Sequence, residues 1–180
     1  MKLIPYISIL LAFASVQVNG QCSKPLSDKI MDEYDLVAIA STNEEEILGD
    51  FFLNAHQVFK GRVPNGILIN SPDFVFEKGV RYLVFAKDTV NSRFFVGNPN
   101  VECFLTTKLS DVTNETNEFL QERWISQCYS KALEDSMTGS MTRELQPFCG
   151  CDGKTYENFG HLLSKGITQY RPGECEKNEQ

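Results

Sequence analysis

Residues 141–175 read MTRELQPFCGCDGKTYENFGHLLSKGITQYRPGEC, and this stretch decides how the C-terminal part of the chain folds. Two turn signals, Cys149-Gly150 and Asp152-Gly153, come directly before the β-prone pair Thr155-Tyr156. Asn158 then predicts the N-cap of a short helix. A unit of this size buries too little apolar surface to be stable through packing alone. The stretch therefore predicts a small disulfide-rich α+β unit that depends on cross-links.

This stretch resembles a Kazal-type protease-inhibitor module. The resemblance rests on residues at matching spacings, which are Pro147, Cys149, Gly150, Asp152, Gly153, Thr155, Tyr156, Asn158 and Cys175. Kazal inhibitors present an extended, preorganised loop to a serine protease. The resemblance implies that the specificity residue of this loop is Arg143, with Thr142 before it and the scissile bond between Arg143 and Glu144.

The stretch departs from the Kazal pattern at several cysteine positions. The second and fourth framework cysteines, which are bonded partners in the family, would fall at Met141 and Gly160, and both are absent. The fifth position, near Leu163, also lacks cysteine, while Cys151 is an additional one. Without the nearest cross-link, three interpretations of Arg143 stay open. It lies in an inhibitory loop, in a segment that proteases cleave, or on the surface as a solvated charge.

The composition of the whole chain fits an exported protein with one good core. Of its 180 residues 42% are hydrophobic and 23% are charged, and six are cysteines. Residues 1–20 combine Lys2, an apolar run too short to span a bilayer and small residues at the end, which predicts a signal peptide. The even number of cysteines fits an oxidising compartment. We therefore expect a secreted, extracellular protein, in which Asn114 begins an N-glycosylation acceptor sequence.

Charge and hydropathy argue against two classes of partner. The formal net charge is -7 and the sequence pI is about 4.9, so the chain has no basic stripe that could release phosphate counterions. No long apolar run follows the first twenty residues. We therefore expect no nucleic-acid ligand and no membrane span.

Five short β-prone segments separated by turn signals follow the N-terminal region. They are residues 35–40, 51–60, 67–69, 82–86 and 94–96. Apolar strands with open edges invite pairing with other chains, and closure into a barrel removes those edges. The spacing therefore predicts a mainly β fold with some α structure, built on a small five-stranded closed barrel whose inward side chains fill its centre.

This region resembles a netrin-like module, the OB-type barrel shared by tissue inhibitors of metalloproteinases and the first domain of agrin. The matching features are residues 35–40, 58–61 and 79–85, together with Cys22 and Cys103. They cover roughly residues 22–124. Taken together, the netrin-like and Kazal-like resemblances imply the disulfides Cys22 to Cys103, Cys128 to Cys151 and Cys149 to Cys175.

Residues 117–134 give the strongest helix signal in the chain. Apolar side chains recur there at helical spacing, with Leu120, Trp124 and Cys128 on one stripe and Ile125, Tyr129 and Leu133 beside it. We expect this helix to pack across the barrel through an ordinary core face. Residues 135–140 predict a linker. The expected division is a signal peptide at 1–20, a barrel with its helix at 21–134 and a Kazal-like module at 141–180.

The sequence lacks a pattern typical of catalysis. His56 and His161 are the only histidines, and neither lies at a recognisable spacing from a nucleophile, a carboxylate or a metal-ligating cysteine. Cys149 and Cys151 could form a redox pair, but the turn residues around them favour structural disulfides in an exported chain. We therefore expect a protein that is not an enzyme and needs no cofactor and no metal.

Three functions fit these features. The first is serine-protease inhibition through the Arg143 loop, and the second is extracellular-matrix binding or scaffolding without inhibition. The third follows from the netrin-like resemblance, because tissue inhibitors of metalloproteinases bind the catalytic zinc through an N-terminal cysteine. Here Gln21 precedes Cys22, and Lys24 stands where that family has its second cysteine. We expect a protein-binding protein of the inhibitor type, whose partner is an extracellular protease or a matrix protein.

Overall fold

The computed structural model describes residues 25–43, 50–71, 74–89, 93–96, 105–137 and 144–176. The predicted signal peptide, Cys22 and Cys103 lie outside these ranges. Within the described ranges, no helix combines the length and the apolar character needed to cross a membrane.

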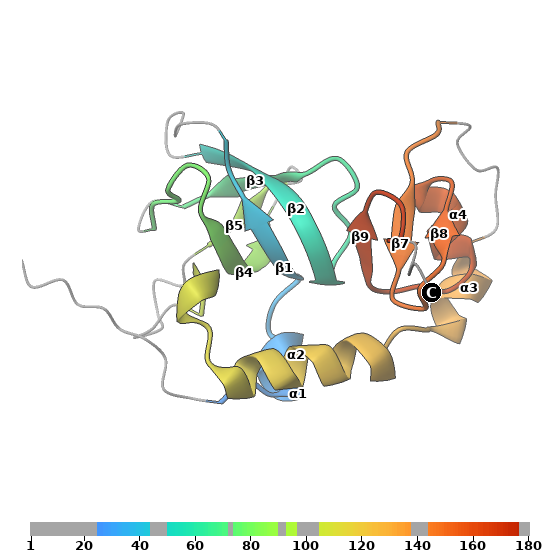
Figure 1. Ribbon diagram of the computed structural model, residues 1–180, viewed down its shortest axis with the longest axis horizontal. Coiled ribbons are helices and arrows are strands. Elements are labelled where there is room, and N and C mark those ends of the chain that lie inside the picture. The colour runs from blue at the N-terminus through green and yellow to red at the C-terminus, as the bar shows by residue number, and fades with distance from the viewer. Residues whose placement is uncertain are drawn as a thin grey trace, which may run out of the picture.

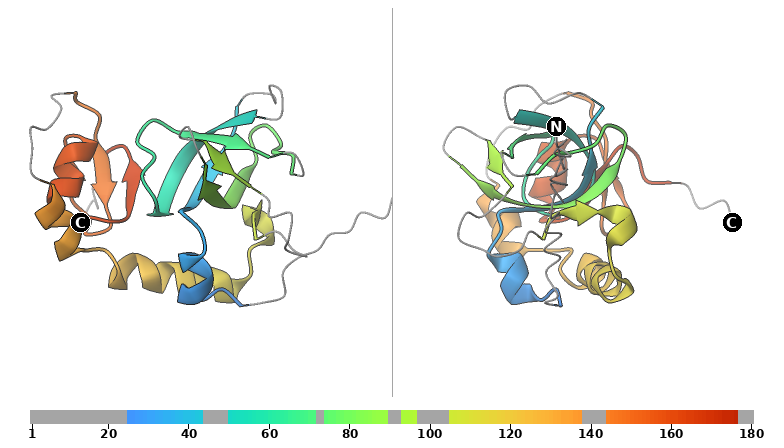
Figure 2. Two further views of the ribbon diagram at one scale, coloured as in Figure 1. Left: turned by 180° about the vertical axis from the view of Figure 1, so that it is seen from behind. Right: turned by 90° about the vertical axis from the view of Figure 1, so that its left-hand side faces the viewer.

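Five strands form a closed barrel. They are β1 (Leu36–Ser41), β2 (Asp50–Lys60), β3 (Ile67–Asn70), β4 (Arg81–Asp88) and β5 (Phe94–Phe95). β1 pairs with both β2 and β4, β3 pairs with β2, and β5 closes the ring by running antiparallel to β4 and parallel to β3. Figure 1 shows these strands wrapped around one another, and the right-hand view of Figure 2 looks along the ring. The predicted five-stranded barrel is confirmed, and its mixed pairing is consistent with an OB-like topology.

Alternation along the strands separates two apolar cores. Leu36, Ala38 and Ala40 of β1 belong to the cluster inside the barrel, whereas Val37 belongs to a second cluster outside it. The same split occurs in β4, so both strands are buried on both faces and read as continuous apolar runs. The outer cluster is the surface on which the helices pack.

Two helices cover the outer cluster, α1 (Asp28–Asp32) and α2 (Asn114–Ser126). A short 3₁₀ helix, η1 (Leu109–Asp111), and a two-residue strand, β6 (Thr107–Lys108), which pairs with β4, lead into α2. α1 contributes Met31, which is fully buried, and α2 contributes Leu120 and Trp124. The Trp124 ring meets Phe59 edge to face, with ring centroids 5.8 Å apart. The prediction that this segment packs across the barrel is therefore confirmed.

The predicted single helix over residues 117–134 is wrong in its extent. α2 begins earlier, at Asn114, and ends at Ser126, and a second helix, α3 (Lys131–Ser136), follows after a break. At the break Cys128 is in a disulfide and Tyr129 forms a β-bridge with Ile167. These long-range links pull the backbone out of the helical path. Tyr129, which follows the break, is exposed, and so is Ile125, which lies within α2 on the side away from the buried Leu120 and Trp124, although the periodicity placed both beside the buried stripe.

Residues 144–176 form the C-terminal region. It contains β7 (Phe148–Gly150), β8 (Thr155–Tyr156), α4 (Phe159–Ser164) and β9 (Tyr170–Pro172), with β7 between β8 and β9. The predicted strand at 155–156 is confirmed. So is the predicted cap, because the Asn158 side chain accepts a hydrogen bond of 2.8 Å from the His161 amide.

The C-terminal region continues the barrel sheet. Tyr170 of β9 pairs with Val58 of β2, on the strand edge opposite β1. The Tyr170 hydroxyl also accepts a hydrogen bond of 2.8 Å from the Val63 amide. Phe148 and Tyr170 belong to the same apolar cluster as the barrel interior. Figure 1 shows β9 standing beside β2.

Candidate functional site

The segment that follows Arg143 is exposed and begins the C-terminal region. Thr142 and Arg143 lie outside the described residues, whereas Glu144, the residue after the expected scissile bond, is described and exposed. The Leu145 side chain is 83% exposed. In Figure 1 this segment forms the end of the region that lies farthest from α2. A single exposed apolar side chain is ordinary on a protein surface, so Leu145 matters here only as part of the exposed segment.

Three hydrogen bonds hold residues 146–147, just behind that exposed segment. The Gln146 amide donates to the Glu157 carbonyl at 3.1 Å, and its side-chain Nε2 donates to the Pro64 carbonyl at 3.2 Å. The Pro147 carbonyl accepts a bond of 2.8 Å from the Gly173 amide. The exposed segment therefore emerges from a fixed base that includes a loop of the barrel.

Two disulfides hold the C-terminal region together. One joins Cys149 to Cys175, within the region, and the other joins Cys151 to Cys128, just after α2. These are two of the three pairings that the family resemblances imply. The third, Cys22 to Cys103, lies outside the described residues. Position 160, which would hold the fourth Kazal cysteine, lies within α4. The disulfides indicate an oxidising environment.

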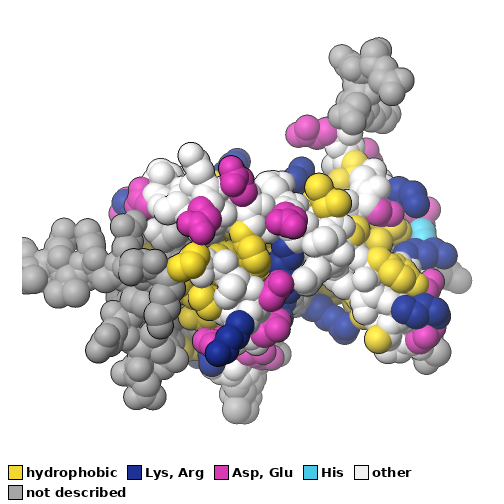
Figure 3. Space-filling model, turned by 90° about the horizontal axis from the view of Figure 1, so that it is seen from below, with side chains coloured by type: hydrophobic (Ala, Val, Ile, Leu, Met, Phe, Trp, Pro, Cys, Tyr) yellow, Lys and Arg dark blue, Asp and Glu magenta, His cyan; other side chains and the backbone are white. Residues whose placement is uncertain are grey.

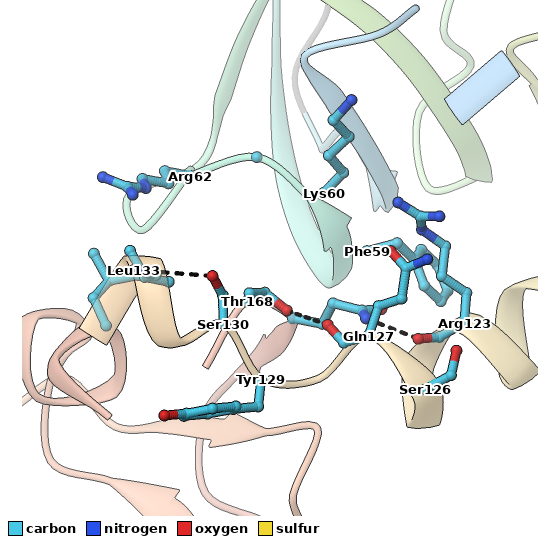
Figure 4. A pocket seen from close by; sticks show the side chains of 13 residues that line it. Phe59, Lys60, Arg62, Arg123, Ser126, Gln127, Tyr129, Ser130, Leu133 and Thr168 are labelled. Atoms are coloured by element: carbon cyan, nitrogen blue, oxygen red, sulfur yellow. Dashed lines mark hydrogen bonds between the residues drawn. The ribbon is translucent and has the colours of Figure 1, made fainter. Parts of the chain in front are cut away.

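A cavity of about 530 Å³ separates the end of β2 from the α2–α3 junction (Figure 4). Three cations line it, but they do not converge. Arg123 forms an ion pair with Asp28, and the Lys60 ammonium donates to the Met31 carbonyl at 3.0 Å. Both therefore serve to hold α1. Figure 4 shows the Arg62 side chain pointing away from Arg123. The arrangement is that of a structural junction rather than an anion site.

The structure also brings together Ser41 and His56, a pair that the sequence did not indicate. The Ser41 Oγ and the His56 Nε2 are 2.8 Å apart, from β1 and β2. Burial, and to a smaller extent the charge of Arg81, lower the pKa of His56. Ser41 is 8% exposed, so the contact reads as a hydrogen bond between neighbouring strands. Ser41 and His56 are fifteen residues apart in the sequence, and only the register between β1 and β2 shows that they are neighbours.

The remaining candidate residues from the sequence are the glycosylation site at Asn114 and the histidine His161. Asn114 is the first residue of α2 and is exposed, and the Thr116 hydroxyl of its acceptor sequence bonds to Thr113. His161 lies on α4, half-buried against Tyr156. Among the described residues, no three His, Cys, Asp or Glu side chains lie close enough together to hold a metal ion.

Comparison of the chain with protein-family models, with curated proteins and with solved structures found no match. The structure itself defines the class: a five-stranded mixed closed β-barrel covered by helices, with a C-terminal region that carries two disulfides and a short helix.

Proposed function

We propose that the protein is an exported, non-enzymatic protein-binding protein of the protease-inhibitor type, with a contact loop centred on Arg143 and Glu144. The observation that carries the proposal is the exposed segment 144–145, fixed from behind by the hydrogen bonds of Gln146 and Pro147. A loop that is already ordered before the protease binds loses little entropy on binding, and so it binds tightly. Here, these bonds and the Cys149–Cys175 disulfide would supply the order that the missing cross-link supplies in Kazal inhibitors.

Arginine at position 143 selects the target class. Trypsin-like proteases accept a basic side chain in a pocket that ends in a carboxylate. Leu145 would then contact the protease on the leaving-group side of the scissile bond, since it is the second residue after that bond.

Titration of trypsin with the oxidised protein tests the proposal. We expect a stoichiometric loss of trypsin activity that Arg143→Ala abolishes and that Arg62→Ala, a change at an exposed arginine elsewhere in the chain, leaves intact. Mass spectrometry of the mixture follows the bond between residues 143 and 144. Rapid and complete cleavage there, with no loss of trypsin activity, would contradict the inhibitor function. Retention on matrix components that Arg143→Ala does not alter would instead support the matrix-binding alternative.

A further inference from the structure

Ile125 and Tyr129 form an exposed apolar pair at the junction between α2 and the C-terminal region. Their exposed fractions are 78% and 55%. Isolated hydrophobic residues on a surface are ordinary, but two that border the same pocket are typical of a binding surface. α2 does not need them for its own packing, because Leu120 and Trp124 fill its buried face.

Both side chains line an open pocket of about 760 Å³, which we call the Ile125 pocket. Its apolar lining is completed by the Cys128–Cys151 disulfide and by Tyr156 and Ile167, which are 6% and 4% exposed. The pocket therefore has buried apolar walls beside an exposed apolar rim. It is formed by residues other than the 144–147 segment.

The rim of the pocket is held in a defined position. Tyr129 forms a β-bridge with Ile167, and its hydroxyl donates to a Glu134 carboxylate oxygen at 2.6 Å. The Tyr129 ring lies over Gly166, where an added Cβ would approach Cε2 to 2.8 Å and where φ is +70°. Only glycine fits this position without strain. A partner would therefore meet a preorganised surface, which reduces the entropy lost on binding.

The polar part of the pocket has one more lysine than carboxylate. Lys154, His161 and Lys165 line it, with Asp152 as the one carboxylate among its lining residues. That carboxylate accepts a bond of 2.8 Å from the Tyr156 hydroxyl and lies 3.5 Å from the Lys154 ammonium. Lys165 is exposed and makes no ion pair with the acids that the structure describes. Figure 3 shows hydrophobic, basic, acidic and histidine side chains together at this end of the molecule.

Because Lys154 pairs with Asp152, Lys165 is the unpaired charge among these lining residues, and its sign is opposite to the formal net charge of the whole chain, which is -7. Self-association through the pocket would bring two acidic molecules together, whereas an acidic partner is attracted to its rim. We propose that the Ile125 pocket docks a segment of a partner protein that carries an apolar side chain next to a carboxylate. The apolar side chain would fill the pocket between Ile125 and Tyr129, and the carboxylate would pair with Lys165.

Selection of peptides from a displayed random library against the full, oxidised protein tests this inference. We expect the selected peptides to share an acidic residue close to a large apolar one. A synthetic peptide of that sequence should lose about tenfold or more in affinity for Ile125→Ala, as expected for a central contact residue. Val75→Ala is the matched control, because Val75 is also an exposed aliphatic residue, at 68%, away from the pocket. It should leave the affinity unchanged.

Charge reversal identifies the polar contact. Lys165→Glu should weaken the peptide several-fold, and a peptide with lysine in place of its acidic residue should recover binding to that variant. Ile125→Ala and Lys165→Glu should both inhibit trypsin as strongly as the unchanged protein does. A failure of the pocket proposal can therefore be told apart from a failure of the proposed Arg143 loop. Selected peptides that share no such pattern, or that bind Ile125→Ala unchanged, would overturn the inference. So would sedimentation showing a dimer that Ile125→Ala dissociates, because the occupant would then be a second copy.

Discussion

At the scale of single residues, Tyr170 connects the two parts of the fold. Its backbone pairs with Val58 of the barrel, and its ring contacts those of Phe148 and Phe159, with centroids 5.5 Å and 5.1 Å away. Its hydroxyl satisfies the buried amide of Val63. Losing such a hydrogen bond while the amide stays buried costs about 1–3 kcal/mol. One side chain thus links the register of β9, the aromatic packing and the loop after β2.

The burial of Tyr170 predicts a loss of stability in alkali. Burial raises the pKa of its hydroxyl to about 12, although the Val63 hydrogen bond and the Arg62 charge lower it in part. A tyrosine in the unfolded chain ionises near pH 10. Between these two pH values only the unfolded state loses the proton, so the contribution of Tyr170 is complete below pH 10 and is lost as the pH rises toward 12.

Urea denaturation at pH 8, 10 and 11 measures this effect. The free energy of unfolding should fall above pH 10, and it should fall less steeply in Tyr170→Phe, which has no hydroxyl to ionise. The pKa of Tyr156 is also raised, first by burial and then by the hydrogen bond to Asp152. Because Tyr156 is still present in Tyr170→Phe, the stability of that variant keeps part of its dependence on pH. Equal slopes for both proteins would show that Tyr170 ionises as readily when folded as when unfolded.

At the scale of elements, the strands were predictable because their pattern is local. The apolar runs at 35–40 and 82–86 match β1 and β4 to within two residues, since strands buried on both faces leave a continuous hydrophobic signal. The break after α2 was not predictable. Leu120, Trp124 and Cys128 keep helical spacing up to it, and what ends the helix is contact with Cys151 and Ile167, far along the chain.

The disulfide at this break fixes the end of α2 to the C-terminal region, which predicts a clear effect of its removal. It closes a loop of 23 residues, and the chain-entropy model assigns such a cross-link about 3 kcal/mol of stability. The double variant Cys128→Ala with Cys151→Ala should lower the free energy of unfolding in urea by about that amount. Replacing both cysteines leaves no thiol that could mispair. An unchanged midpoint would mean that α2 is held by packing alone.

At the scale of the whole molecule, the barrel and the C-terminal region differ in what holds them. The barrel closes on itself around a broad apolar core, whereas the 33 residues from 144 to 176 depend on two disulfides and on contact with β2. The sequence predicted both bodies. It did not predict their joining at Val58 and Tyr170 or the pocket beside Ile125, because both arise only when distant segments meet.

This difference predicts an order of unfolding on reduction. With dithiothreitol present, hydrogen exchange should first appear at the amides of β7 to β9 and α4, while those of β1, β2 and β4 stay protected. Exchange with the disulfides intact is the control, and it should be slow in both parts. Simultaneous loss of protection in the barrel strands would show that the shared apolar cluster makes the chain one cooperative unit.

The pairing of β9 with β2 also has a consequence for solubility. β2 has eleven residues, and on the edge opposite β1 the strand β3 pairs only with the first four of them. Without β9, the backbone groups near Val58 on that edge would have no strand partner. An uncovered strand edge recruits like edges from other molecules and can seed fibres. By pairing with part of this edge, β9 prevents strands of other molecules from pairing there. Clipping by a protease ahead of Tyr170, together with reduction of the Cys149–Cys175 disulfide that would otherwise retain β9, would expose this edge of β2 and promote aggregation.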